Sequence, residues 1–341
     1  MAGGTAWSTA TSWPPTSTST WPPSPTRPGA SWTPARPSPC GGSALAMRER
    51  PLVVALAVAL DLLFGEPPRR LHPVVAVGRF AAWLEGKLHR PGLGPLREVA
   101  AGGVVVLAVA GAAVGSASLV VRALRRLPSV VRVAAEAALL STTFSIRELV
   151  ASAHRVAEAL EGGDLPEARR RVGEIVGRET SHLPAEEVVR AAVESVAENV
   201  TDAVTAPLFY AFLGGLPLAM GYRAVNTLDA MVGHRSPRYV HFGRAAARLD
   251  DALNFLPARL AVPFFPVAAW ASGLDAKRCW ATLLRDGRKH PSPNAGIPEA
   301  AVAGALGVRL GGVNVYEGRV EERPFLGEAV RPLAPGRIRE G

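Results

Sequence analysis

Three carboxylates follow one another at four-residue intervals in ESVAENVTDAVTAPLFYAF, residues 194–212. Glu194, Glu198 and Asp202 lie at i, i+4 and i+8, on one helical face, one turn after Arg190. Like charges at this spacing repel unless a cation compensates them. The face is therefore either a solvated surface with an Arg190–Glu194 pair or a cluster that binds Mg²⁺ or an amine. The apolar run that follows at once favours the second interpretation.

A second polar segment, YRAVNTLDAMVGHRSPRYVHFGRAAARLDDALNFLPARL, occupies residues 222–260. Its carboxylates, amides and guanidinium groups alternate with apolar residues at helical spacing. Salt bridges between residues three apart explain only part of this density. The polar residues are Asn226, Asp229, Arg244, Arg248, Asp250, Asp251, Asn254 and Arg259.

A third segment, RDGRKHPSPNAGIPEAAVAGALGVRLGG, is a Gly/Pro-rich loop that leads into a helix, at residues 285–312. Exposed amides and a following helix N-terminus can hold anions, so such loops are frequent ligand sites. A lone histidine beside prolines is more often a turn residue than a base. The loop carries Asp286, Lys289, His290, Ser292, Asn294 and Glu299. A fourth segment, DLLFGEPPRRLHPVVAVGRF, follows the first apolar run at residues 61–80.

Several familiar sites are absent from the sequence. It contains no GxxxxGK[ST], HExxH, GxSxG or CxxC motif, so any nucleotide site is of a non-standard kind. Its two cysteines, Cys40 and Cys279, are far apart, which supports neither a disulfide scaffold nor a zinc site.

Long apolar runs must position these polar segments. The uncharged run Val99–Val121 is long enough to cross a hydrocarbon core of roughly 30 Å. Ala203–Tyr222 contains Pro and Gly and predicts a kinked helix, and Leu260–Leu274 is shorter and contains Pro. Polar helices are predicted at Ile146–Leu160 and Leu165–Val176. We predict an all-α fold, a multi-pass integral membrane protein with about four to six hydrophobic helices, kinked spans and polar helical loops. The alternative is a soluble α-domain with buried helices.

Composition agrees with a membrane location. Hydrophobic residues make up 48% of the 341 residues, and the net charge of +9 suits phosphates or lipid headgroups. Nucleic acid is not expected as a partner, because no nucleic-acid-binding motif occurs. Residues 1–46 form a Pro/Ser/Thr-rich stretch without acidic residues, for which we expect disorder and a mis-assigned start, with translation beginning at or near Met47. We expect one membrane-embedded domain at 47–325 and a flexible C-terminal tail at 326–341.

The polar segments, taken in this order and together with VGRET at residues 176–180, resemble the CbiB/CobD family of cobalamin-biosynthesis membrane proteins, the adenosylcobinamide-phosphate synthases. The resemblance covers residues 50–320. Small departures include Glu66 and Glu179, where the family pattern has Asp, and Ile297, where it has Trp. The longer glutamates weaken any metal-ligand role at those two positions.

The resemblance implies a carbon–nitrogen ligase that joins aminopropanol, or its O-phosphate, to a propionate of adenosylcobyric acid, giving cobinamide or its phosphate. A carboxylate is a poor electrophile, so the resemblance implies ATP and Mg²⁺ as cofactors and activation through an acyl phosphate. It also implies a bacterial inner-membrane location, an active site on the cytoplasmic side, and other corrinoid-pathway membrane enzymes as partners.

Site residues follow from the resemblance and from the chemistry of each side chain. Glu194, Glu198 and His290 are expected to be catalytic, as acceptors of the amine proton. Asp202, Asp250 and Asp251 are expected to bind Mg²⁺. The expected substrate- and phosphate-binding residues are Arg178, Asn199, Asn226, Asp229, Arg248, Asn254, Arg259, Lys289, Ser292 and Asn294. A membrane transporter and a non-catalytic corrinoid-binding scaffold are the alternatives. Charges that gather in loops and at helix ends, rather than in the middle of a span, favour the enzyme.

Overall fold

The computed structural model describes residues 41–70, 72–92, 94–234, 236–316 and 318–341. The chain divides into two compact units, Met1–Ala44 and Leu45–Gly341. Of the first unit only residues 41–44 are described, and they form the beginning of a helix. The predicted low-complexity tail therefore lies outside the described residues, apart from 41–46.

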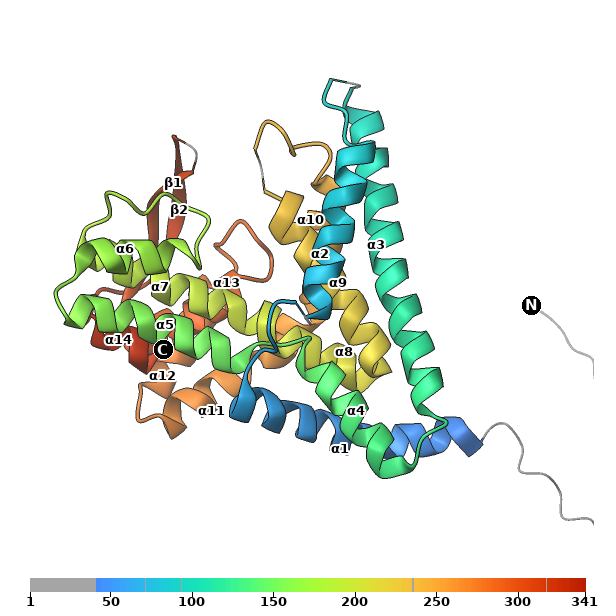
Figure 1. Cartoon of the computed structure of the whole chain (residues 1–341). Coiled ribbons are helices and arrows are strands. Elements are labelled where there is room, and N and C mark those ends of the chain that lie inside the picture. Colours follow the sequence, from blue (N-terminus) through green and yellow to red (C-terminus); the bar gives the residue numbers. More distant parts are fainter. Residues whose placement is uncertain (1–40, 71, 93, 235, 317) are drawn as a thin grey trace, which may run out of the picture. The chain divides into compact units, whose positions relative to one another are not determined.

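Helices make up most of Leu45–Gly341, as predicted (Figure 1). They are α1 (Gly41–Phe64), α2 (Pro73–Leu88), α3 (Pro95–Leu124), α4 (Ser129–Ser141), α5 (Ile146–Glu161), α6 (Leu165–Gly173), α7 (Ala185–Val200), α8 (Ala206–Gly214), α9 (Leu216–Val232), α10 (Arg244–Ala261), α11 (Phe264–Ala271), α12 (Ala276–Asp286), α13 (Gly296–Leu306) and α14 (Gly336–Glu340), with the π-helix η1 (Thr201–Thr205) between α7 and α8.

The beginnings of α5 and α6 show why these polar helices start where they do. Asp164 Oδ1 accepts a hydrogen bond from the backbone N–H of Glu167 at 3.0 Å, so Asp164 caps α6. The buried Asp61, at the end of α1, caps α5 from a distance: its Oδ2 accepts from the N–H groups of Ile146 and Arg147 at 3.0 and 3.1 Å. Carboxylates are favoured at both places because helix N-termini carry unpaired N–H groups and a positive dipole end.

A β-hairpin near the C-terminus departs from the all-α prediction. Strand β1 (Arg309–Tyr316) pairs antiparallel with β2 (Arg319–Gly327), with an irregularity between Leu310 and Gly312. Gly318, in the turn, has φ 73°, a conformation that favours glycine. The prediction failed here because the Gly-rich stretch hides a short alternation of valines in VNVYEGRVE.

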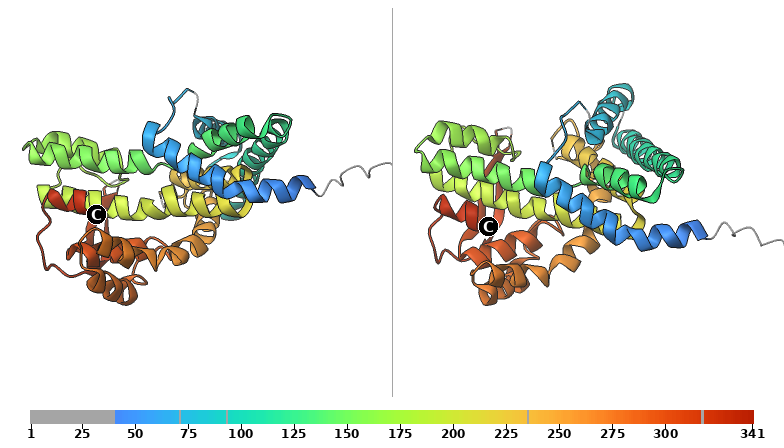
Figure 2. Two further views of the ribbon diagram at one scale, coloured as in Figure 1. Left: turned by 90° about the horizontal axis from the view of Figure 1, so that it is seen from below. Right: turned by 60° about the horizontal axis from the view of Figure 1, so that its bottom comes forward.

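The hairpin packs into a core shared with several helices. Val156 of α5, Val188 of α7 and Leu306 of α13 are fully buried together with Leu310 of β1. Helices α5 and α7 lie beside each other in both views of Figure 2. Burying side chains of this size contributes roughly 1.5–3 kcal/mol each, so the hairpin is an integral part of the unit.

The C-terminal segment also belongs to this core. Ile338 of α14 is buried in it, and Arg339 lies 2.9 Å from Glu161 at the end of α5. This packing differs from the flexible tail expected at 326–341.

Some of the apolar runs form helices that are long and apolar enough to cross a membrane. Among the described residues, Pro95–Leu124 and the stretch Ser129–Glu161 could each cross a membrane. Helices α10 and α11 make a third candidate only if their 51° bend lies within one span. The break predicted within Ala203–Tyr222 is present at Gly215, where φ is 69° and α8 gives way to α9.

Candidate functional site

The continuous rod of α7, η1 and α8 carries the three carboxylates with which the sequence analysis began. Its middle section, Thr201–Thr205, is a π-helix, in which each turn holds one residue more than in an α-helix. Such insertions are frequent at functional sites. Glu194 and Glu198 lie in α7 and Asp202 lies in η1, and the three carboxylates have three different environments.

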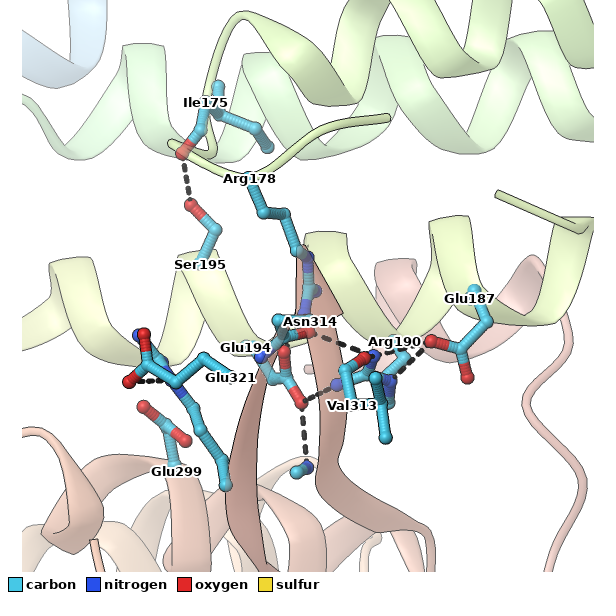
Figure 3. A network of polar contacts seen from close by, with 12 residues as sticks. Ile175, Arg178, Glu187, Arg190, Glu194, Ser195, Glu299, Val313, Asn314 and Glu321 are labelled. Atoms are coloured by element: carbon cyan, nitrogen blue, oxygen red, sulfur yellow. Dashed lines mark hydrogen bonds and ion pairs between the residues drawn. The ribbon is translucent and has the colours of Figure 1, made fainter. Parts of the chain in front are cut away.

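Glu194 is buried within an ion-pair network that joins α7 to the hairpin (Figure 3). Its Oε2 lies 2.8 Å from Arg178 Nη2, and its Oε1 lies 2.9 Å from Arg190 Nη1. Gly311 N–H donates to the same Oε1 at 2.7 Å. Asn314 Oδ1 accepts from both guanidinium groups. Every partner needed by a buried carboxylate is supplied, so Glu194 has little freedom to accept a substrate proton.

Glu198 has a different environment one turn later. Its side chain is exposed, and it has no hydrogen bond or ion pair with any described residue. Desolvation by the surrounding protein raises its pKa above the ordinary value, with Glu194 acting in the same direction and Arg323 and Arg178 opposing it. A side chain can touch water and still have much of its hydration replaced by protein. An accessible carboxylate with a raised pKa is suited to general-base catalysis.

Asp202 and Asp250 are held together by Asn254, in what we call the Asp202–Asn254–Asp250 bridge. Asn254 Nδ2 lies 2.9 Å from Asp202 Oδ1 and 2.8 Å from Asp250 Oδ2. Tyr222 donates its hydroxyl to Asn254 Oδ1 at 2.8 Å, which orients the amide. Burial raises the pKa of Asp202, and the nearby carboxylates of Glu198 and Asp229 raise it further.

Two more predicted residues of α9 lie at the edge of this bridge. Asn226 Nδ2 lies 3.4 Å from Asp250 Oδ1, and Asn226 Oδ1 accepts from Arg223 at 3.1 Å. Burial raises the pKa of Asp229 to about 6, helped by Asp251 and Glu198. Carboxyl groups are therefore concentrated where η1, α9 and α10 meet, and burial favours their protonated forms.

The Pro-rich loop before α13 packs on α10. Asn294 Nδ2 donates to the backbone carbonyl of Asp251 at 2.7 Å, and Ser292 Oγ lies 3.3 Å from Asp251 Oδ1. Arg259 Nη1 donates to Asn294 Oδ1 at 3.1 Å while its guanidinium covers the Phe255 ring. Arg259 Nη2 also lies 3.3 Å from the carbonyl oxygen of Pro293, and the side chain is partly exposed.

His290 is placed as a hydrogen-bonding group rather than as a base. Its Nδ1 accepts from the backbone N–H of Ser292 at 3.0 Å, so in the neutral ring the proton lies on Nε2. That nitrogen lies 3.6 Å from Glu299 Oε1 and 3.4 Å from Arg323 Nη1. Burial lowers the pKa of His290 to about 4, and Arg323 lowers it too. The ring is neutral at pH 7, with no free lone pair.

Three predicted residues do not bond to the other predicted site residues. Lys289 Nζ lies 2.7 Å from Asp286, a buried carboxylate that also pairs with Arg285. Asn199 donates to the carbonyl of Ser195 in its own helix at 2.8 Å. Arg248 is exposed, and among the described residues it has no hydrogen-bonding or ion-pair partner.

The donor set of the Asp202–Asn254–Asp250 bridge fits Mg²⁺ in kind. In the described part of the chain, no three His, Cys, Asp or Glu side chains come together to hold a metal ion. Mg²⁺ commonly takes one or two protein carboxylates and completes its shell with water and phosphate oxygens, so two aspartates suffice. A role for Asp251 as a third ligand stays a prediction.

The sequence analysis missed the contribution of the hairpin. Arg323 of β2 acts electrostatically on Glu198, Glu299 and His290, and Asn314 of β1 anchors both arginines of the Glu194 network. The available signal was the pair of valine-containing runs on either side of Gly318, which is typical of a hairpin.

The chain is similar to known proteins over most of its length. The family model described as CobD/Cbib protein matches residues 54–341. The cobalamin biosynthesis protein CobD of Geobacter metallireducens is 49% identical over 84% of this chain and 89% of its own length. CobD of Klebsiella pneumoniae is 43% identical over 83% of this chain and 89% of its own length. The cobalamin biosynthesis protein CbiB of Salmonella choleraesuis is 41% identical over 83% of this chain and 89% of its own length. No solved structure matches the chain. On the extent of these matches, the chain belongs to the CobD/CbiB family.

Proposed function

We propose that this protein acts in cobalamin biosynthesis and forms the amide bond between aminopropanol, or its O-phosphate, and a propionate of adenosylcobyric acid. The family and the names of its relatives support the pathway. The chemistry of the site supports a ligation, because an accessible base lies beside groups suited to bind metal and phosphate.

The single observation that carries the proposal is the environment of Glu198. It is an exposed carboxylate with a raised pKa, and its charge acts on the nearby Asp202, whose pKa it raises. An attacking ammonium group must lose a proton before it becomes a nucleophile. Glu198 takes that proton, since both oxygens of Glu194 are engaged and His290 offers no free lone pair.

Activation of the propionate requires a leaving group. Mg²⁺ bound with ATP would neutralise phosphate charge during transfer of the γ-phosphoryl group to the propionate oxygen. Asp202 and Asp250 would hold the ion, and the exposed Arg248 with Arg259 would bind phosphate oxygens. The amine would then attack the carbonyl carbon, and the C–N bond would form as the C–O bond to phosphate breaks. Of the two protons that the ammonium group loses, Glu198 would hold the first and the departing inorganic phosphate would take the second.

We also propose that the protein is a multi-pass protein of the bacterial inner membrane with this site on the cytoplasmic side. Besides the candidate spans, large apolar side chains are exposed on their surfaces, among them Leu107 of α3 and Trp270 of α11, each 75% exposed. Such exposure is unfavourable in water and expected in contact with lipid. A ligase with soluble nucleotide and amine substrates would work on the polar side of these helices.

Purified protein incubated with adenosylcobyric acid, aminopropanol phosphate and Mg-ATP tests the proposal. The expected result is cobinamide phosphate together with ADP, and a loss of at least about 100-fold in rate in Glu198→Gln. Glu186→Gln is the matched control, because Glu186 is exposed in the first turn of the same helix. Absence of product from folded wild-type protein would favour the corrinoid-binding scaffold if the corrinoid binds, and the transporter if reconstituted vesicles take it up.

A further inference from the structure

Glu299 is a second carboxylate near Glu198, and the proposed reaction does not use it. Glu299 lies in the first turn of α13 and is only 2% exposed. Its Oε1 is buried and has no hydrogen-bonding partner in the described part of the chain. That atom lies 3.6 Å from His290 Nε2.

A buried carboxylate ionises only where cations or several N–H donors compensate it. The neighbours of Glu299 do not meet this condition. Glu194 and Glu198 of α7 add negative charge, while Arg323 of β2 and Arg178 oppose them. Arg178 is already paired with Glu194.

Arg323 does not serve Glu299 alone, because its guanidinium lies near several other groups. Its Nη1 lies against His290, its Nε lies 4.0 Å from Glu321, and it acts on Glu198 as well as on Glu299. In α12, the buried Asp286 is paired with Arg285 and Lys289. Helix α11 has no ionisable residue, and in α10 Asp250 is held by Asn254.

The positive end of the α13 dipole favours an ionised glutamate, but this effect is small beside full burial. The desolvation of Glu299 also raises its pKa well above the ordinary value, which agrees with the geometry.

We propose that Glu299 is a positioning residue that carries a proton at neutral pH and acts as the neutral partner of the base Glu198. Its role is to keep one negative charge away from Glu198 and from phosphate-bearing substrates. Two nearby carboxylates that divide one proton in this way take different roles. The part of the inference that concerns the reaction rests on the proposed function.

Infrared difference spectroscopy tests the protonation directly and needs no activity. At neutral pH, wild type minus Glu299→Gln should contain the C=O stretching band of a carboxylic acid. A carboxylate band in its place would overturn the proposal. Gln matches protonated Glu in size and charge, so failure of Glu299→Gln to fold would also count against it.

The pH dependence of kcat/KM gives a second test once wild-type activity is established. If Glu299 is neutral, Glu299→Gln leaves the acid limb, which reports Glu198, at its wild-type position. If Glu299 is ionised, its removal takes away a neighbouring negative charge, and the limb moves to lower pH. Glu299→Ala should lower the rate by about tenfold or more, and Glu299→Gln should recover part of this loss. Glu322→Gln, at an exposed position of strand β2, is the control.

An inactive wild type with a carboxylic acid band would reject the proposed function and leave the protonation intact. An active wild type whose acid limb shifts in Glu299→Gln would reject the inference alone.

Discussion

Asp202 and Asp250 share one side-chain amide, that of Asn254, at 2.9 and 2.8 Å. The amide donates both of its protons to carboxylates from two different elements and accepts the hydroxyl of the fully buried Tyr222. One neutral residue therefore joins η1, α9 and α10 at the site where carboxyl groups are concentrated.

Replacement of Asn254 by Ala should lower the free energy of unfolding by about 2–3 kcal/mol, because Asp202, Asp250 and Tyr222 each lose a buried partner. Chemical unfolding in detergent measures the change. Asn199→Ala is the comparison, since the Asn199 amide bonds only within its own helix and its loss should cost less. Equal losses in the two variants would mean that the bridge contributes nothing particular to stability.

Replacement of Glu194 by Gln should destabilise the protein by about 3–5 kcal/mol, because it leaves Arg178 buried without a paired carboxylate and Arg190 with Glu187 alone. Glu187→Gln removes a carboxylate from the exposed side of Arg190 and should cost less than about 1 kcal/mol. Thermal unfolding of both variants checks this. A Glu194→Gln protein with wild-type stability but no activity would instead support the catalytic role predicted from the sequence.

Asp286 should make stability depend on pH in the acidic range. Burial alone raises the pKa of its carboxyl, but Arg285, Lys289 and the N–H of Gly327 outweigh this and hold the pKa well below its ordinary value. A depressed folded-state pKa gives stabilisation that is present above the unfolded value, about 3.9, and is lost as pH falls through the folded value.

Wild type should therefore exceed Asp286→Asn in stability at pH 7, and the difference should shrink below about pH 4. Unfolding measured across this range gives the comparison, with the exposed Glu322→Gln as a variant for which no trend is expected. A difference that is constant with pH would show that Asp286 acts through packing alone.

Two neighbouring glycines of α3 should respond oppositely to Ala. A Cβ at Gly102 would lie 1.9 Å from the carbonyl oxygen of Phe242, whereas a Cβ at Gly103 meets no atom within 4 Å. Gly102→Ala should cost about 1–3 kcal/mol by forcing α3 away from the start of α10. Gly103→Ala should be neutral or stabilising by up to about 1 kcal/mol through helix propensity. Similar melting temperatures for the two variants would contradict the close packing at Gly102.

Much of the helical framework was predictable from the sequence because its signals are local. The uncharged run Val99–Val121 lies within α3, and Asp164 caps α6 as its position before Pro166 indicated. The Gly-Pro interruption after Ala203 marks the change from α8 to α9. Each of these depends on residues within one or two turns of one another.

The ionic partners within the site were not predictable in the same way. The Arg190–Glu194 pair, which spacing allowed, is present, but the second partner, Arg178, comes from a loop and is fixed by Asn314 of the hairpin. The spacing of residues along a helix cannot indicate a partner such as Asn314, which lies more than a hundred residues away in the sequence. The separate environments of Glu194 and Glu198, and with them the distinction between a paired and an accessible carboxylate, follow only from the three-dimensional structure.

The π-helical turn at Thr201–Thr205 also determines the direction in which the side chains of α8 point around the helix axis. An α-helix turns about 100° per residue, so one residue more or fewer redirects all later side chains by that angle. A deletion of one residue in this turn would restore regular α-helix between Glu198 and α8. It would also rotate α8 relative to α7, and with it the register that brings Asp202 to Asn254. The site therefore depends on the length of this rod as strictly as on the identity of its carboxylates.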